Sequence, residues 1–182
     1  LEGGVDAIEL TLRTDVALPA LAKVRQAVPE MMVGIGTILR PDQVDAVAEA
    51  GADFGVAPGT NRRVIRQAKE RGLPFGPGVM TPTDIEMALQ EDCRVLKYFP
   101  ANTSGGLPHL KNIAAPFEHL GIGFIPLGGI NAANMGEYLE SPLITAIGGS
   151  WLAPRDLIQA QDWPEVTNRA AEARAVADSI RS

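Results

Sequence analysis

Short apolar runs alternate along the chain with longer segments whose apolar residues recur at helical spacing. The runs predict strands at residues 6–12, 31–38, 52–58, 73–79, 94–100, 121–128 and 143–149. Each run, taken with the segment after it, has the length of one β–α unit. Such alternation predicts parallel strands covered by helices.

The segments between the runs carry helix signals. Helices are predicted at residues 41–51, 61–72, 81–91 and 163–180. The first begins at Pro41 and ends at Gly51, an asymmetry that is common in helices. Thr81 or Thr83 is the expected N-cap of the third, and Asn131 that of a further helix after the sixth run.

Seven such units in succession predict a (β/α)8 TIM barrel that lacks its first β–α unit in this chain. Barrels of this kind usually need about 200 residues or more, and the chain has 182. It opens at Leu1, directly before a predicted strand, so we expect a further unit to precede it in the intact protein. A doubly wound open sheet is the alternative, but no G-x-G-x-x-G motif follows an early strand. The chain lacks an internal linker, which predicts a single domain over residues 1–182.

Composition restricts the function. The net charge of −6 argues against a nucleic-acid partner, and no apolar run approaches the roughly 18 residues that span a membrane. Cys93 is the only cysteine, which favours a reducing, cytoplasmic location over a disulfide framework. His109 and His119 have no partner at metal-ligand spacing, so neither a metal nor another cofactor is expected.

Two strands carry unexpected charges. Strand alternation places Glu9, Thr11 and Arg13 on the side opposite the apolar residues of the first strand, toward the barrel interior. An internal ion pair between Glu9 and Arg13 is one interpretation. Lys97 lies in the middle of the fifth apolar run and, if it points inward, shares the interior with Glu9.

A buried lysine is unfavourable unless it is paired or used. A structural Lys97–Glu9 pair is one explanation. Burial also favours the neutral form of an amine, which can attack a carbonyl to form a Schiff base while a carboxylate moves protons. We expect this second use for Lys97.

Glycine pairs end two strands and suggest an anion site. Gly128–Gly129 and the segment Gly149–Ser150 end successive predicted strands, where barrels commonly bind phosphate. Thr37 ends another strand, where it is either a donor to a substrate carboxylate or a cap for the following helix.

The motifs GVDAIELTLRT, GIGTIL, APG, LKYFPA, GGIN and IGGSWL occur in this order between residue 3 and about residue 160. In order and spacing they resemble the class I 2-keto-3-deoxy-6-phosphogluconate (KDPG) aldolases, which overlap with the 4-hydroxy-2-oxoglutarate (KHG) aldolases. The resemblance implies a metal-independent aldolase on a (β/α)8 barrel, usually a homotrimer, that acts on a small 2-keto acid phosphate.

The resemblance also implies a role for each candidate residue. Lys97 matches the Schiff-base lysine and Glu9 the acid–base carboxylate. The remaining matches are Arg13 and Thr37 for the substrate carboxylate, and Gly128, Gly129, Gly149 and Ser150 for the phosphate. Leu127 stands where the family commonly has threonine, so a hydrogen bond to the keto-acid end is lost. Two alternatives follow: preference for unphosphorylated 4-hydroxy-2-oxoglutarate, or a catalytically silent phosphate-binding barrel.

Overall fold

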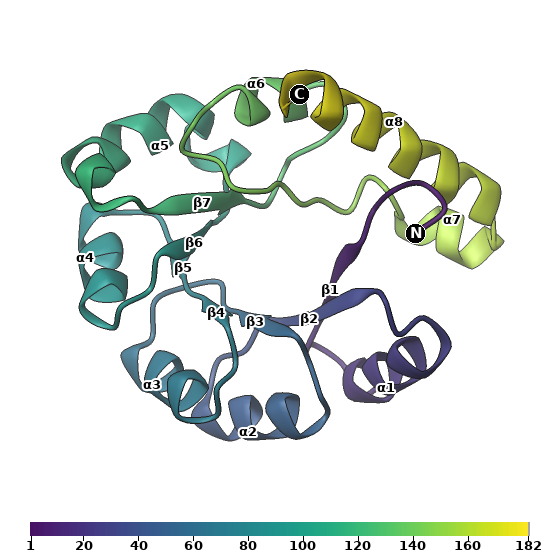
Figure 1. Cartoon of the computed structure of the whole chain (residues 1–182), viewed down its shortest axis with the longest axis horizontal. Coiled ribbons are helices and arrows are strands. Elements are labelled where there is room, and N and C mark those ends of the chain that lie inside the picture. The colour runs from purple at the N-terminus through teal and green to yellow at the C-terminus, as the bar shows by residue number, and fades with distance from the viewer. Residues whose placement is uncertain (182) are drawn as a thin grey trace.

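The computed structural model describes residues 1–181, in which strands and helices alternate as the hydrophobic pattern predicts. The strands are β1 (Ala7–Thr11), β2 (Met32–Gly36), β3 (Phe54–Val56), β4 (Phe75–Gly76), β5 (Gly78–Val79), β6 (Val95–Tyr98) and β7 (Gly123–Pro126). The helices are α1 (Ala17–Ala27), α2 (Pro41–Glu49), α3 (Arg62–Glu70), α4 (Pro82–Gln90), α5 (Gly106–Ala114), α6 (Met135–Leu139), α7 (Arg155–Ala160) and α8 (Trp163–Arg181), with 3₁₀ helices η1 (Asn102–Ser104) and η2 (Ala115–Leu120). The strands lie around the centre and the helices outside them (Figure 1).

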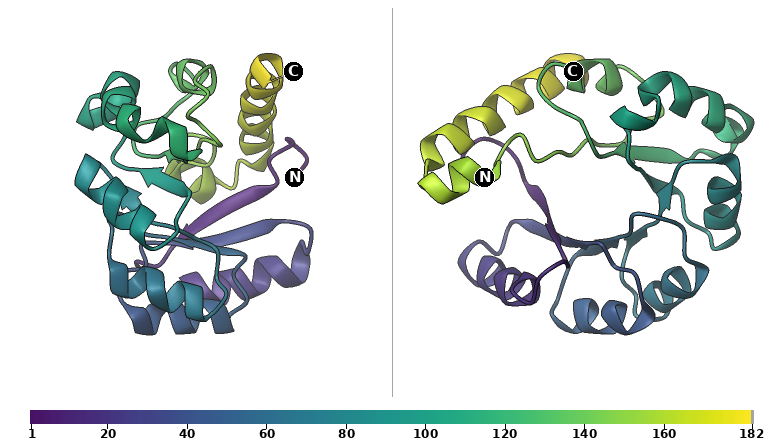
Figure 2. Two further views of the ribbon diagram at one scale, coloured as in Figure 1. Left: turned by 60° about the vertical axis from the view of Figure 1, so that its left-hand side comes forward. Right: turned by 180° about the vertical axis from the view of Figure 1, so that it is seen from behind.

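All paired strands are parallel, and they form two sheets. The first has the order β1-β2-β3-β4 and the second the order β5-β6-β7. One predicted strand, residues 73–79, is divided between them at Pro77, because proline has no N–H to give to a ladder. Seen from two further sides, the strands still follow one another around a common centre (Figure 2). The protein is therefore a parallel α/β fold with a barrel-like arrangement.

The predicted strand at residues 143–149 is wrong. This segment makes a single bridge, Phe124 to Ile144, beside a hydrogen bond from the Thr145 N–H to the Phe124 carbonyl (2.9 Å). Among residues 1–181, its backbone hydrogen bonds to a strand run to β7 alone, and the bridge at Ile144 does not continue into a ladder. The apolar run instead becomes an irregular connection to Gly148 and Gly149.

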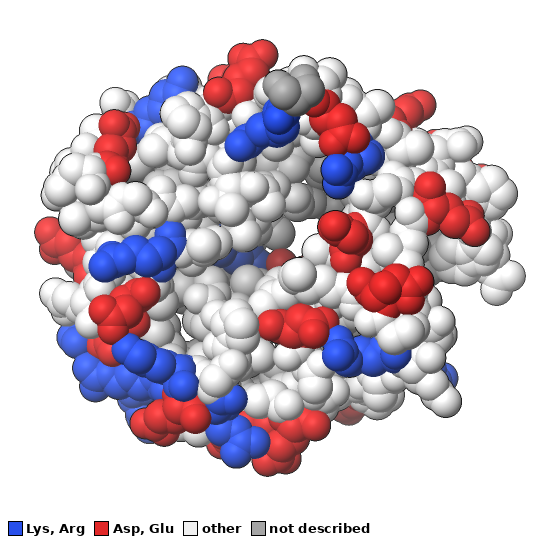
Figure 3. Space-filling model, viewed as in Figure 1, with Lys and Arg blue, Asp and Glu red and all other residues white. Residues whose placement is uncertain are grey.

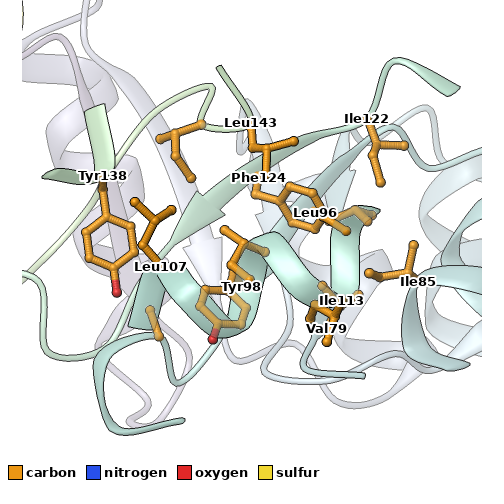
Figure 4. Packing of buried hydrophobic residues seen from close by; sticks show 14 of the residues in the cluster. Val79, Ile85, Leu96, Tyr98, Leu107, Ile113, Ile122, Phe124, Tyr138 and Leu143 are labelled. Atoms are coloured by element: carbon orange, nitrogen blue, oxygen red, sulfur yellow. The ribbon is translucent and has the colours of Figure 1, made fainter. Parts of the chain in front are cut away.

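The core is divided in the same way as the sheets. One cluster joins α1, α2 and α3 to the first sheet through Leu21, Ile35 and Val44. The other joins the second sheet to α4, α5 and α6 through Leu96, Tyr98 and Phe124 (Figure 4). Each of these side chains is fully buried. Burial of each larger aliphatic side chain stabilises the folded state by about 1.5–3 kcal/mol.

The long helix α8 closes the circle on the side of the N-terminus. A Cβ atom on Gly3 would lie 2.6 Å from the Ala170 Cβ, so the first residues lie directly against this helix (Figure 2). Helix α8 carries charged residues along its length and has no fully buried residue. No helix among the described residues combines the length and the apolar character needed to cross a membrane.

One predicted helix cap is confirmed and another is wrong. The Thr81 hydroxyl accepts a hydrogen bond from the Asp84 N–H, and the Asp84 carboxylate accepts one from the Thr81 N–H. This reciprocal pair stabilises the start of α4. Asn131 does not cap α6, which begins at Met135. Its side chain accepts a hydrogen bond from the Ala133 N–H instead, in a turn that precedes the helix.

The carboxylate of Glu91 links α3 to the end of α4. Hydrogen bonds from Arg66 and Arg62 lower the pKa of this carboxyl to about 2. A carboxyl with a depressed pKa stabilises the folded state above its unfolded pKa of about 4.3, and this stabilisation is lost as the pH falls toward 2. We expect Glu91→Gln to lower the melting temperature at neutral pH, with a difference from the wild type that shrinks between about pH 5 and pH 2.

Thermal melts across this pH range test the role of Glu91. Glu86→Gln, an exposed substitution on α4, is the matched control and should change the melting temperature little at any pH. A difference between wild type and Glu91→Gln that stays constant down to pH 2 would contradict the assignment.

Candidate active site

Lys97 and Glu9 meet in the interior of the barrel-like arrangement. The Lys97 Nζ lies 3.1 Å from Glu9 Oε1 and 3.3 Å from Glu9 Oε2. The side chains are only 8% and 18% exposed, so the ion pair is largely shielded from water. The space-filling view shows the centre of this face hollowed, with basic and acidic atoms inside the hollow (Figure 3). The predicted meeting of the two residues is thus confirmed.

Strand alternation explains the direction of Lys97. Leu96 and Tyr98 point outward into the core beneath the helices, so Lys97 points to the opposite side of β6. Parallel pairing on both sides holds its backbone, since Lys97 is in register with Gly78 and with Ile125. The ring of Phe99, on the same side of the chain, lies 5.3 Å from the Nζ. The lysine is therefore held between a carboxylate and an aromatic face.

The same alternation directs Glu9. Ile8 and Leu10 pack against the core of the first sheet, which leaves Glu9 on the inner side. The alternative ion pair between Glu9 and Arg13 is wrong: Arg13 lies beyond the end of β1 in an exposed turn. Within residues 1–181, the ion-pair partner of Glu9 is Lys97.

Thr37 directly follows β2 in an unusual backbone conformation. Its φ is +65°, a left-handed value that is rare for a β-branched residue and costs about 1–3 kcal/mol. Helix α2 starts at Pro41 and its N-cap is Arg40, so Thr37 is not the helix cap. Backbone strain of this kind is common at functional sites, and the binding role of Thr37 stays a prediction.

The two glycine loops touch one another. Gly128 and Gly129 have φ values of +92° and +80°, which a residue with a side chain adopts only with strain. A Cβ atom on Gly149 would lie 2.8 Å from the Ile130 carbonyl oxygen, so the second loop packs directly on the first. The following helices begin only at Met135 and Arg155. The glycine loops are therefore separated by several residues from the helix N-termini that follow them.

Leu127 lies between these loops. It follows β7 two residues after Ile125, the register partner of Lys97, so alternation directs its side chain to the inner side. Its Cδ2 would be 3.2 Å from a Cβ atom on Gly148. Phe99 thus places an apolar ring beside the Lys97 amine, and Leu127 is directed to the same inner side.

Sequence analysis missed the support for the second loop. Arg169 of α8 donates a hydrogen bond to the Trp151 carbonyl (3.0 Å) and pairs with Glu165 (2.7 Å). This arginine ties the C-terminal helix to the chain directly after Ser150, which is exposed. No local pattern distinguishes Arg169 from the other charged residues of α8, so the contact depends on tertiary structure alone.

His109 occupies a structural position. His109 Nε2 lies 3.1 Å from the Met80 carbonyl oxygen, and its ring stacks on Tyr98. This contact places His109 near the end of β5. Within residues 1–181, no three His, Cys, Asp or Glu side chains are grouped so that they could hold a metal ion.

The parallel strands in a barrel-like arrangement and the buried lysine–carboxylate pair between them place the protein among the barrel enzymes. Within that class, the chain belongs to the KDPG and KHG aldolase family, whose model matches residues 1–169. The KHG/KDPG aldolase of Escherichia coli (strain K12) is 40% identical over 171 residues, which cover 94% of this chain and 79% of the relative. The 2-dehydro-3-deoxy-phosphogluconate aldolase of Dickeya dadantii is 39% identical, over 95% of this chain and 80% of the relative.

Solved structures agree with the family. A KDPG aldolase from Legionella pneumophila with pyruvate captured as a covalent carbinolamine intermediate superposes with a TM-score of 0.90 and 35% identity, over 94% of this chain and 82% of that one. A KDPG aldolase of Zymomonas mobilis with 3-phosphoglycerate superposes with a TM-score of 0.86 and 36% identity, over 94% of this chain and 79% of that one.

Proposed function

We propose that the protein is a class I aldolase that cleaves KDPG to pyruvate and glyceraldehyde 3-phosphate. The contact between the Lys97 Nζ and the Glu9 carboxylate, at 3.1 and 3.3 Å, carries this proposal because the reaction needs an amine nucleophile beside a group that moves protons. The names of the relatives support the substrate, and the pyruvate carbinolamine of the Legionella structure supports covalent chemistry at an amine.

In the first half of the reaction the Lys97 Nζ attacks the C2 ketone. The carbinolamine formed loses water and becomes an iminium, with the proton transfers carried by Glu9 and solvent. The Lys97 side chain is 8% exposed, so its Nζ lies in a site that is largely shielded from water. The iminium then draws electrons from the neighbouring C3–C4 bond.

In the second half Glu9 removes the proton of the C4 hydroxyl. The C3–C4 bond breaks, C4 leaves as the aldehyde of glyceraldehyde 3-phosphate, and the bonding electrons form an enamine on C3. Protonation of C3 returns the iminium, and water releases pyruvate and the free Lys97 amine. Protons, electrons and water balance without a metal or a second reactant.

The two ends of the substrate are assigned to separate groups. Arg13 and Thr37, at the ends of β1 and β2, are proposed to bind the carboxylate. The touching loops that contain Gly128, Gly129 and Gly149–Ser150 are proposed to bind the phosphate through backbone N–H groups and the serine hydroxyl. The phosphoglycerate in the Zymomonas structure supports recognition of a phosphorylated three-carbon unit in this family.

The wider architecture is also a proposal. We infer that residues 1–182 form a single domain, and that a further strand completes the (β/α)8 barrel along the free edge of β1, which has β2 as its neighbour within residues 1–181. A cytoplasmic homotrimer remains our expectation from the family resemblance.

Trapping with pyruvate tests the proposed function most directly. Borohydride reduction in the presence of pyruvate should add one stable adduct, and peptide mapping should locate it on Lys97. Lys23, Lys69 and Lys111 are the internal controls, because all three are exposed on the surface whereas Lys97 is buried beside Glu9. An adduct on one of these three, or none at all, would contradict the proposal.

The alternative substrate is separated by product assay. Cleavage of 4-hydroxy-2-oxoglutarate requires the same Lys97 chemistry but gives glyoxylate and no phosphorylated product. The glycine loops favour the phosphorylated substrate, so we expect a higher kcat/KM with KDPG. A higher kcat/KM with 4-hydroxy-2-oxoglutarate would show that the protein is primarily a 4-hydroxy-2-oxoglutarate aldolase. Ligand binding without any trapped adduct would indicate a catalytically silent barrel.

A further inference from the structure

Gly36, the last residue of β2, lies against the carboxylate of Glu9. A Cβ atom on Gly36 would overlap Glu9 Oε1 and would lie 2.6 Å from Glu9 Cδ and 3.0 Å from Glu9 Cγ. Carbon atoms in favourable contact are about 3.5–4.0 Å apart. The space that a side chain at residue 36 would fill is therefore already occupied by the Glu9 carboxylate.

The backbone itself does not require glycine at this position. Gly36 is absent from the glycines with positive φ, whereas its neighbour Thr37 has a φ of +65°. An alanine could adopt the Gly36 conformation without strain. Glycine is needed here because it has no side chain, which leaves room for the Glu9 carboxylate.

The β2 backbone is also held in place at this point. The Gly36 carbonyl accepts a hydrogen bond from the Leu12 N–H (2.8 Å), and the Ile38 N–H donates to the Val56 carbonyl (3.2 Å). These bonds fix the end of β2 to β1 on one side and to β3 on the other. The steric overlap that a side chain at residue 36 would cause is thus relieved most easily by movement of the Glu9 carboxylate, which is the end of a flexible side chain.

We propose that Gly36 is a positioning residue. Its lack of a side chain forms a slot that holds the Glu9 carboxylate 3.1 and 3.3 Å from the Lys97 Nζ. The inference rests on the proposed function, in which Glu9 moves protons at the bound substrate. Gly36 acts through Glu9 and makes no contact with the reacting atoms itself.

Gly36→Ala is the direct test. We expect a folded protein whose melting temperature is close to that of the wild type, because alanine restricts the unfolded chain more than glycine does, which offsets the weakened contact between Glu9 and Lys97. The kcat for KDPG cleavage should fall by about 100-fold, the effect of displacing a catalytic group by roughly 1 Å, with a much smaller change in KM. The pyruvate adduct on Lys97 should persist, while exchange of the pyruvate methyl protons with deuterium from the solvent should slow in parallel with kcat.

A double-mutant cycle shows whether the effect passes through Glu9. In a Glu9→Gln background, which has no carboxylate to displace, Gly36→Ala should lower kcat by no more than about twofold, since groups that act as a unit are not additive. Losses that multiply in the double variant would overturn the inference.

Gly34→Ala is the matched control on the same face of β2. A Cβ atom there would overlap the ring of Phe54, to which its three nearest atoms belong, whereas at Gly36 the three nearest atoms belong to Glu9. We expect this variant to lower the melting temperature and to exchange pyruvate protons at a rate within a few-fold of the wild type. The reverse pattern, with stability lost in Gly36→Ala and kcat unchanged, would overturn the inference.

The outcomes separate the two proposals. A wild-type protein that forms no adduct on Lys97 would contradict the proposed function and remove the basis for a slot. A wild-type adduct on Lys97 together with normal proton exchange in Gly36→Ala would overturn the role of Gly36 alone.

Discussion

Replacement of Lys97 by methionine is expected to lower kcat for KDPG cleavage by about 10⁴-fold or more, because the covalent path is lost with its nucleophile. Methionine is unbranched and of similar length, so it fits a side-chain position that is 8% exposed. The borohydride-trapped pyruvate adduct should disappear completely. Stopped assays of pyruvate release and mass spectrometry of the trapped protein measure both effects.

Two further variants make the Lys97 result interpretable. Lys97→Arg keeps a positive charge beside Glu9 but offers no nucleophilic amine, and it should be as inactive as the methionine variant. Lys111→Met, an exposed position on α5, should retain wild-type kcat. Substantial cleavage by folded Lys97→Arg would show that another group forms the covalent bond.

Glu9→Gln is expected to lower kcat by about 10²- to 10⁴-fold, the usual range for loss of a general acid–base group. Glutamine has the shape of glutamate and still accepts a hydrogen bond from the Lys97 Nζ, but it does not exchange protons at the substrate. The adduct with pyruvate should therefore still form on Lys97, more slowly. This combination of a trapped adduct with little turnover distinguishes an acid–base group from the nucleophile.

A second carboxylate serves as the control for Glu9. Glu86→Gln, exposed on α4, should leave both kcat and the adduct unchanged. If folded Glu9→Gln turned over KDPG within a few-fold of the wild type, Glu9 would be only the structural counter-ion of Lys97.

The periodic pattern of the sequence predicts most of the fold because local constraints set it. Six of the predicted apolar runs contain strands, and the helices at 41–51, 61–72, 81–91 and 163–180 are all present within a few residues. The seventh run, 143–149, is not a strand, because within residues 1–181 it bridges β7 at a single position and does not continue as a ladder. Pairing is a tertiary property that the composition of one segment does not contain.

The inward directions of Glu9 and Lys97 follow from strand alternation alone, and the structure brings the two side chains within 3.1 Å. Gly36 was out of reach of such reasoning, because its importance lies in the space it leaves for a residue 27 positions away, as the contact with Glu9 shows. A usable signal is a glycine at an inward position of the strand next to an inward carboxylate. Arg169 carries no comparable signal, since its partner is a backbone carbonyl.

The division of the strands into two sheets, each with its own core cluster, has a consequence for how activity arises during folding. Glu9 belongs to the sheet of β1–β4 and Lys97 to the sheet of β5–β7, and 88 positions separate them in the chain. Each half can bury apolar residues before the other is in place, but the amine and the carboxylate meet only when the halves dock. Catalytic activity therefore measures whether the two halves are packed together. Partial unfolding of either half would abolish activity while much of the helical structure persists.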